Sequence, residues 1–338
     1  MDINTHHELG AGLKDGDVIP FTPHLLMPKT IANFPVYLKR GSKFVMYSRG
    51  GDSFGAGHRA QLASLGHEQV FIEASRKQDY DAYVVSNISG ILTDETIPAK
   101  DRAETWSDTV CILVREFFEA HLPLAIKVEQ YRHLERIVRN SKRFFSEPGA
   151  LGKLAKFISK NNDEYHHGIG TMIFTACLMR THTDNELLLM ASGIGAILHD
   201  VGLMRLPKSI REKNPSEYDE CEKAIYTAHP TLSVAMCAPI PLVPEAIETI
   251  LLHHERMDGR GFPSGAMDTD IPLHGRAVAL ANAYDGLTRP QGWRPAYTPF
   301  QALSHIRDDP GGYDQDLFKR LVGLLAREDI TTEIRTNT

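Results

Sequence analysis

The sequence predicts a mainly α-helical protein, in which a small α/β domain rich in strands precedes a C-terminal helical bundle. The chain has 338 residues, enough for two domains of ordinary size. In the first hundred residues, short apolar segments show partial alternation with polar residues, which is typical of strands. From about residue 95 onward, apolar residues recur at helical spacing instead.

The N-terminal domain is expected to span residues 1–95, with its boundary in 90–105. The segment FPVYLKRGSKFVMYS (34–48) reads as two short strands around an Arg40-Gly41-Ser42 turn. A helical stretch, HRAQLASLG, and a strand in EQVFIEA follow. The glycines of RGGDSFGAG (49–57) could suggest a phosphate cradle, but no GK[ST] follows, so a loop is the simpler interpretation.

Residues 96–150 are expected to form a helical connector or the start of the second domain, with SEPGALG (146–152) as a break. The second domain is placed at 151–330. No internal repeat is evident. Its expected helices span residues 151–182, 185–199, 216–236, 243–254, 274–287, 299–307 and 315–326.

Composition excludes several classes of protein. Hydrophobic residues make up 42% and charged residues 24% of the chain, as in soluble globular proteins. The net charge of −6 argues against a partner that is a nucleic acid polymer. No apolar run reaches the roughly 18 residues that span a membrane, and no signal pattern is evident, so a cytoplasmic protein without a membrane partner is expected.

The four cysteines show no CxxC pairing and fall in helix-like segments: Cys111, Cys177, Cys221 and Cys237. Buried free thiols are expected, rather than zinc ligands or disulfides.

The histidines carry more information. Asp163 and His167 are four residues apart and would share one face of a helix, where they could bind one ion. The alternative is an exposed pair at a helix N-terminus, where aspartate is common.

A second pair, His199-Asp200, follows the apolar run Ile194 to Leu198. Burying a histidine and a carboxylate is costly unless they are paired or bound to metal. The two oxygens of Asp200 could bridge two ions about 3.5–4 Å apart, an arrangement that serves phosphoester attack. A capping pair is the alternative.

Two further histidine positions complete the set. His229 lies at an expected helical break before Pro230, and the apolar helix AIETILL ends in His253, His254 and Glu255 before the turn DGRGFP. The segment RAVALANAYDGLT then offers Asn282 and Asp285 from another helix.

The order of these motifs resembles that of the HD-GYP family. LHDVG, AHP, HHERMDGRGFPSG and IPLHGRAVALANAYDGLT carry the resemblance, over roughly residues 150–325. It implies an HD-type helical bundle that holds two or three divalent metal ions, commonly iron or manganese. Active members hydrolyse cyclic di-GMP to the linear dinucleotide, often continuing to GMP, and a hydroxide bridging the metals would attack phosphorus.

The motifs carry roles over to individual positions. The implied metal ligands are Asp163, His167, His199, Asp200, His229, His253 and His254, with Asn282 as a weaker one. His199 and Asp200 are also the implied catalytic pair. The expected substrate-side residues are Asp258, Gly261, Phe262, Arg289 and Arg294.

Several positions depart from the family pattern. Leu203 replaces the lysine of HDxGK, Phe262 replaces the tyrosine of GYP, and Asn282 replaces an aspartate. Asp163 stands where members with three metals have a glutamate. Leucine has neither charge nor a hydrogen-bond donor, and a neutral amide is a weaker ligand than a carboxylate. The family's single Arg-Pro has two candidates here, at Arg289 and at Arg294, on either side of Gln291-Gly292-Trp293.

Three functions stay open. A metal-dependent phosphodiesterase for cyclic di-GMP, or for a related nucleotide, is favoured by the seven candidate ligands. A metal- and nucleotide-binding signalling protein of weak or no turnover, which acts through a partner protein, is favoured by the three substitutions. A phosphohydrolase of another nucleotide is the third. A homodimer is a further expectation.

Overall fold

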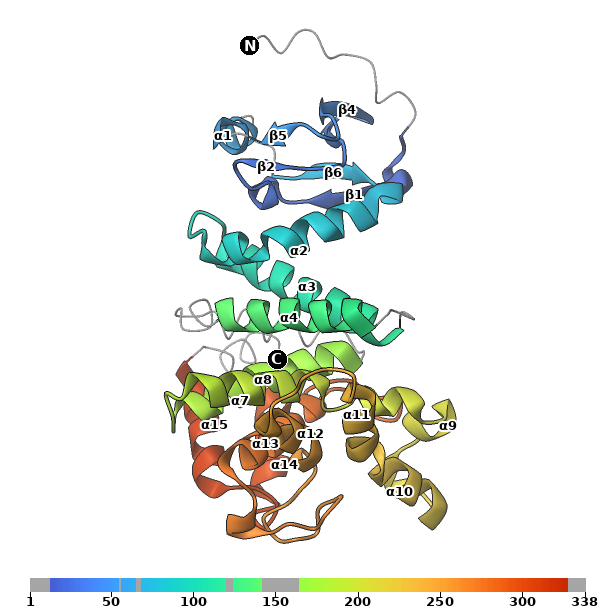
Figure 1. Ribbon diagram of the computed structural model, residues 1–338, viewed down its shortest axis with the longest axis vertical. Coiled ribbons are helices and arrows are strands. Elements are labelled where there is room, and N and C mark those ends of the chain that lie inside the picture. Colours follow the sequence, from blue (N-terminus) through green and yellow to red (C-terminus); the bar gives the residue numbers. More distant parts are fainter. Residues whose placement is uncertain (1–12, 55, 65–67, 120–123, 142–163, 328–338) are drawn as a thin grey trace, which may run out of the picture. The chain divides into compact units, whose positions relative to one another are not determined.

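The computed structural model describes residues 13–54, 56–64, 68–119, 124–141 and 164–327 (Figure 1). By its internal contacts the chain divides into two compact units, Met1–Thr109 and Val110–Thr338. This division falls inside a helix, α3 (Ala99–Glu119), just after the predicted boundary region 90–105. The predicted domain limits themselves stay a prediction.

The N-terminal unit is built on antiparallel strands. One sheet has four strands in the order β1-β6-β3-β4, and a second pairs β2 with β5. The predicted hairpin at 34–48 is confirmed as β3 and β4, which are joined at Gly41 with its φ of +60°. The strands are β1 (Val18–Phe21), β2 (Thr30–Ile31), β3 (Val36–Arg40), β4 (Lys43–Ser48), β5 (Ser53–Phe54) and β6 (Val70–Glu73).

Helices complete this unit as an α/β domain. α1 (Ala56–Ser64) and β6 occur where the sequence predicts them, whereas β5 lies in the segment expected to be a loop. The helix α2 (Lys77–Thr93) contributes Tyr83, Val84 and Ile91 to a core that also contains Phe34 and Ile72. Because α2 offers its apolar residues to the core at helical spacing, it packs as an amphipathic helix.

The C-terminal unit is helical in its described part. Within the predicted helical stretch 216–236, the break expected at His229 before Pro230 is confirmed, because α10 ends at Thr227 and α11 begins at His229. Pro230 lies in the first turn of α11, the position that a residue without an N–H group tolerates. The helices are α4 (Leu124–Asn140), α7 (Glu164–Arg180), α8 (Glu186–Leu198), α9 (Lys208–Arg211), α10 (Glu220–Thr227), α11 (His229–Cys237), α12 (Pro244–Leu252), α13 (Leu273–Leu287), α14 (Pro299–Arg307) and α15 (Gln315–Arg327).

Part of the predicted helix 151–182 and the expected break at 146–152 lie outside the described residues. Within the described part, α7 ends at Arg180.

Glycines let the helices around α8 approach closely. A Cβ atom added to Gly168 of α7 would lie 2.4 Å from the carbonyl oxygen of Ile197 on α8. A Cβ atom on Gly195 of α8 would lie 2.6 Å from the carbonyl oxygen of Ala246 on α12. No side chain fits at either contact, so glycine at these two positions lets α8 pack closely against both α7 and α12.

The segment Glu186–Arg205 corrects one expectation. By length and composition it would suffice to cross a membrane, with a mean hydropathy of 1.7, although the sequence was expected to contain no such run. However, 61% of it is buried inside the protein. A helix that is apolar on all sides is typical of a buried core position, which α8 occupies here.

The cysteines are free, as predicted, although not all are buried. Cys111 and Cys237 are buried, Cys177 is half-buried, and Cys221 is exposed on α10.

The close approach of α7 to α8 gives a stability prediction. Replacing Gly168 by alanine should lower the free energy of unfolding by about 1–3 kcal/mol, because the added methyl overpacks a backbone contact. Gly323→Ala on α15 is the matched control, since nothing lies within 4 Å of its added Cβ. It should be neutral or stabilising, by up to about 1 kcal/mol. Urea unfolding followed by circular dichroism measures both, and equal effects would contradict this account of the packing.

Candidate metal centre

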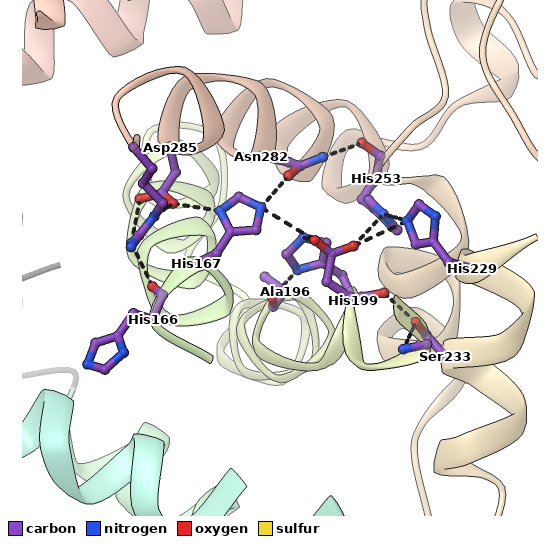
Figure 2. A network of polar contacts seen from close by, with 12 residues as sticks. His166, His167, Ala196, His199, His229, Ser233, His253, Asn282 and Asp285 are labelled. Carbon is purple, nitrogen blue, oxygen red and sulfur yellow. Dashed lines mark hydrogen bonds and ion pairs between the residues drawn. The ribbon is translucent and has the colours of Figure 1, made fainter. Parts of the chain in front are cut away.

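Helix ends bring five histidines and an aspartate together. Figure 2 shows four of these histidines, His167, His199, His229 and His253. His199 and Asp200 follow the last residue of α8, and His229 is the first residue of α11. His253 and His254 follow the last residue of α12. His167 comes from the first turn of α7, and Asn282 and Asp285 come from α13.

Three of the imidazoles are oriented by carbonyl groups near the helix ends. Nδ1 of His199 lies 2.7 Å from the carbonyl oxygen of Ala196. The Nδ1 atoms of His229 and His253 make the same contact three residues back, at 2.7 Å to Tyr226 and 2.6 Å to Ile250. The last four carbonyls of a helix have no N–H partner within the helix, so they are available to accept these bonds.

These contacts fix the tautomers. A carbonyl oxygen can only accept, so Nδ1 of each ring carries the proton and Nε2 of a neutral ring carries a lone pair. The Nε2 atoms of His229 and His253 face each other at 3.0 Å. Oδ1 of Asp200 lies 3.2 Å from the first and 3.4 Å from the second, while its Oδ2 lies 3.3 Å from Nε2 of His199.

This arrangement fits a metal ion. Several acceptors converge on one another, and Nε2 of His199 and Oδ1 of Asp200 are buried without a hydrogen-bond partner. Buried acceptors that face one another are unfavourable unless a cation lies between them. Imidazole nitrogens and a carboxylate are also the ligands that divalent transition metals prefer.

The possible ligand atoms form two groups that share Asp200. One group contains Asp200, His229, His253 and His254, and the other contains His167, His199 and Asp200. Within each group the atoms lie within 4.8 Å of one another. Because each carboxylate oxygen of Asp200 faces a different set of histidines, Asp200 has the position of a bridging ligand.

Burial and charge set the protonation of the cluster. Burial opposes a charge on either group, but without a metal ion Asp200 raises the pKa of His199, and the protonated ring in turn holds the pKa of the Asp200 carboxyl well below its usual range. Burial lowers the pKa of His253 to about 3, with a further contribution from His199, and burial likewise lowers the pKa of His254. These two rings are therefore neutral near pH 7, the form that binds metals.

His167 is oriented by a carboxylate. Its Nδ1 lies 2.7 Å from Oδ2 of Asp285, and its Nε2 lies 2.8 Å from Oδ1 of Asn282. The amide of Asn282 donates from Nδ2 to the carbonyl oxygen of His253 at 3.3 Å, which directs its oxygen toward the cluster. Asp285 in turn forms a buried ion pair with Arg289. A carboxylate behind a ligand histidine fixes its ring and increases its basicity.

The turn after His199-Asp200 is held against α11. Ser233 donates its hydroxyl to the carbonyl oxygen of His199 at 2.6 Å and accepts from the N–H of Gly202 at 2.8 Å. A Cβ on Gly202 would lie 2.3 Å from the carbonyl oxygen of His229. Glycine at this position therefore lets the segments bearing His199 and His229 meet.

The turn DGRGFP folds back on His254. The ring of Phe262 stacks on His254, with centroids 4.5 Å apart and planes at 24°, and the Phe262 N–H donates to the carbonyl oxygen of His254 at 3.2 Å. Gly261 leaves no space for a side chain, since an added Cβ would lie 2.5 Å from the backbone. Buried Glu255 fixes the end of the turn by accepting from the N–H and hydroxyl of Ser264, both at 2.7 Å.

The cluster opens into a cavity of about 960 Å³. His167, Asp200, His254 and Asn282 line it, and so does Leu203. A cavity of this size is at the upper end of the range for small-molecule sites, about 300–1,000 Å³.

The expected substrate-side residues have varied positions. Arg289 and Arg294 line the cavity, but Arg289 pairs with Asp285, and Arg294 donates to the carbonyl oxygens of Leu287 and Gly286 at 2.9 and 3.0 Å. Asp258 pairs with Arg256 at 2.8 Å, and this bond lowers the pKa of Asp258 to about 2. Gly261 and Phe262 shape the turn beside His254. Asp163 lies outside the described residues.

Sequence reasoning missed three supporting residues: Asp285 as the partner of His167, Ser233 as a brace, and Glu255 as the anchor of the turn. The i, i+3 spacing of Asn282 and Asp285 on one helix could have indicated the first. Ser233 and Glu255 act through backbone groups, for which the sequence has no signal.

Comparison with known proteins agrees with this geometry. The family model described as HD domain matches residues 132–317, more than half of the chain, so the protein belongs to the HD domain family. Its similarity to HD-GYP proteins, expected from the motifs, is confirmed by the relatives and the solved structure that follow.

The curated relatives act on cyclic dinucleotides. A cyclic di-GMP phosphodiesterase of Pseudomonas aeruginosa is 24% identical over 75% of this chain and 64% of its own length. The cyclic di-GMP phosphodiesterase response regulator RpfG of Xanthomonas campestris is 31% identical over 33% of this chain and 30% of its own. A 3'3'-cGAMP-specific phosphodiesterase of Vibrio cholerae is 33% identical over 34% of this chain and 22% of its own length. The matches thus span less than two thirds of each of these relatives.

A solved structure shares the fold. The protein Bd1817 of Bdellovibrio bacteriovorus, described as an HDG"Y"P protein, matches with a TM-score of 0.64 at 21% identity. The match covers 92% of this chain and all of that one.

The convergence of acceptors on Asp200 gives a prediction about metal content. Protein purified without oxygen should contain two divalent ions per chain by elemental analysis, and His199→Ala should lower this content because it removes a buried ligand atom. His182→Ala is the control, since His182 pairs with Asp316 away from the cluster. A wild-type protein that contains no metal and takes up neither iron nor manganese would refute the metal centre.

Proposed function

We propose that the protein is a metal-dependent phosphodiesterase that hydrolyses cyclic di-GMP. The observation that carries the proposal is the position of Asp200, between two groups of histidines and at the wall of a large cavity. The phosphodiesterase activity of the relatives supports the reaction class, and the cavity volume suits a dinucleotide better than a single phosphate.

The residues of the chain would divide the work as follows. His229, His253 and His254 would hold one ion, His167 and His199 a second, and Asp200 would contact both. When bound, such a pair of ions supplies a nucleophilic oxygen at neutral pH and offsets charge on the phosphoryl oxygens. We propose iron or manganese as the metal, by the resemblance to the HD-GYP family.

The supporting residues would keep this arrangement fixed before the substrate arrives. Asp285 holds the ring of His167, the helix-end carbonyls hold three other rings, and Phe262 covers His254. Groups that are already oriented need no reorganisation during the reaction, which is the main source of electrostatic catalysis.

The substitutions at the cavity favour a second candidate, a metal- and nucleotide-binding protein with little turnover. Leu203 brings an apolar side chain to the cavity wall, and Asn282 brings a neutral amide to His167. Leucine in place of a lysine weakens the attraction for phosphate, and an amide in place of a carboxylate weakens the attraction for a further cation. Turnover measured beside binding separates the two candidates.

The first experiment is an assay of cyclic di-GMP hydrolysis with Mn²⁺ or Fe²⁺, repeated with a chelator. Hydrolysis that the chelator abolishes supports the phosphodiesterase. Binding without hydrolysis supports the second candidate. If the protein neither binds nor cleaves cyclic di-GMP, this substrate is wrong and other nucleotides become the candidates.

Restoring the absent groups should raise turnover. The double variant Leu203→Lys with Asn282→Asp should increase kcat for cyclic di-GMP by about 10- to 100-fold, because one preorganised charged group contributes a factor of about 10²–10³. Leu187→Lys, which adds the same charge at an exposed position of α8 outside the cavity lining, is the control. Phe262→Tyr should have a smaller effect, because the ring is already present. If the wild type binds cyclic di-GMP but the double variant does not hydrolyse it faster, the protein is a dedicated sensor.

A further inference from the structure

The segment that carries both Arg-Pro pairs forms a small hairpin. The N–H of Gln291 donates to the carbonyl oxygen of Arg294 at 2.7 Å, and the N–H of Arg294 donates back to Gln291 at 3.1 Å. Gly292 and Trp293 are therefore the two residues at the tip, as in a two-residue β-turn.

The two arginines anchor the base of this hairpin. Arg289, 2% exposed, donates to the carbonyl oxygen of His166 at 2.7 Å and pairs with Asp285. Arg294 donates to three carbonyl oxygens, those of Leu287, Gly286 and Pro295, at 2.9 to 3.0 Å. Its guanidinium also lies 4.4 Å from the centre of the Tyr297 ring. The hairpin is thereby fixed to the end of α13, the helix that bears Asn282 and Asp285.

This anchoring places Trp293 at the wall of the cavity that contains Asp200 and His167. The side chain is 38% exposed, which is unusual for the largest apolar side chain. Gly292 lies beside the turn after α9, since its added Cβ would be 3.6 Å from the carbonyl oxygen of Glu212. The hairpin tip thus has support from a second segment of the same wall.

The other aromatic rings of this wall already have partners. Tyr226 packs against His229 and Phe262, with centroids 5.0 and 6.1 Å apart, and Tyr218 lies 5.3 Å from Tyr226. Tyr313 lies 6.0 Å from the guanidinium of Arg256. Within the described part of the chain, by contrast, the indole of Trp293 has neither a ring partner nor a hydrogen bond. Its face and its N–H are available to a ligand.

We propose that Trp293 is the stacking platform for a purine base of the bound cyclic dinucleotide, an inference that rests on the proposed function. A cyclic dinucleotide presents two flat bases on a ring that holds two phosphates, so a base can reach the wall while a phosphate lies at the metal cluster. Stacking on an aromatic ring recognises a base through its π-face, and it needs a rigidly held ring more than a network of hydrogen bonds. The anchored hairpin supplies such a ring.

Arg289 and Arg294 then act by positioning Trp293, and the contact with the dinucleotide comes from this residue between them.

The test compares variants of Trp293 in the metal-loaded protein. Trp293→Ala should raise KM for cyclic di-GMP by about 5- to 100-fold, the range for losing one stacked base, and should change kcat by less than about threefold. Trp293→Phe should retain most of the affinity. Phe300→Ala is the control, since Phe300 is 68% exposed on α14 and is not part of the cavity wall. Trp293 is half-exposed at a turn, so its replacement leaves the core intact.

Tryptophan fluorescence adds a readout that does not require turnover. The chain has two tryptophans, and the other one, Trp106, is fully buried in α3. Cyclic di-GMP should quench the emission of the wild-type protein to saturation, and this change should be absent in Trp293→Phe.

Two failures are distinguishable. A wild type that hydrolyses or binds cyclic di-GMP, while Trp293→Ala has an unchanged KM and the emission is not quenched, overturns the role of Trp293 alone. A wild type that does not bind cyclic di-GMP by equilibrium dialysis overturns the proposed substrate, and the stacking platform with it.

Discussion

The site depends on three protons that are held by backbone carbonyls. Nδ1 of His199, His229 and His253 each faces the carbonyl oxygen three residues earlier, near a helix end. With those protons fixed, three Nε2 lone pairs point at one another and at the carboxylate of Asp200. A buried group of acceptors is unfavourable by itself. The bonds that orient the rings therefore also make a bound cation favourable at this site.

The helix ends can meet because glycines lie where the helices contact one another. Gly168 and Gly195 bring α7 and α12 to α8, and Gly202 brings the turn after Asp200 to α11. A methyl group at any of these positions would collide with backbone within 2.6 Å. The candidate metal centre therefore depends on close helix packing as much as on its ligands, since a shift of one helix would separate the two groups that share Asp200.

Most charged side chains near the cluster pair with one another. Asp285 and Arg289 neutralise each other behind His167, and Arg256 is shared by Asp258 and Asp309 at the far side of the turn. These ion pairs hold the walls of the cavity and leave fewer charges for a ligand. Leu203 and Asn282 are uncharged, so they too leave fewer charged groups for a ligand to contact. Recognition of a dinucleotide would then depend more on the metal ions and on an aromatic surface than on a set of basic side chains.

The sequence by itself determined the fold class and most helices of the C-terminal unit, because helical periodicity is a local property. Its candidate ligands followed from the resemblance of its His and Asp motifs to the HD-GYP family. It could not give the short strands β1, β2 and β5 or the residues that support the ligands. Only the tertiary structure decided that Asp200 faces two histidine groups, that Asp258 is engaged by Arg256, and that both arginines beside Trp293 bond to the protein itself. The first and the last depend on backbone carbonyls or on residues distant in sequence, whose positions are set by packing between helices, and the second depends on how the turn after His254 folds.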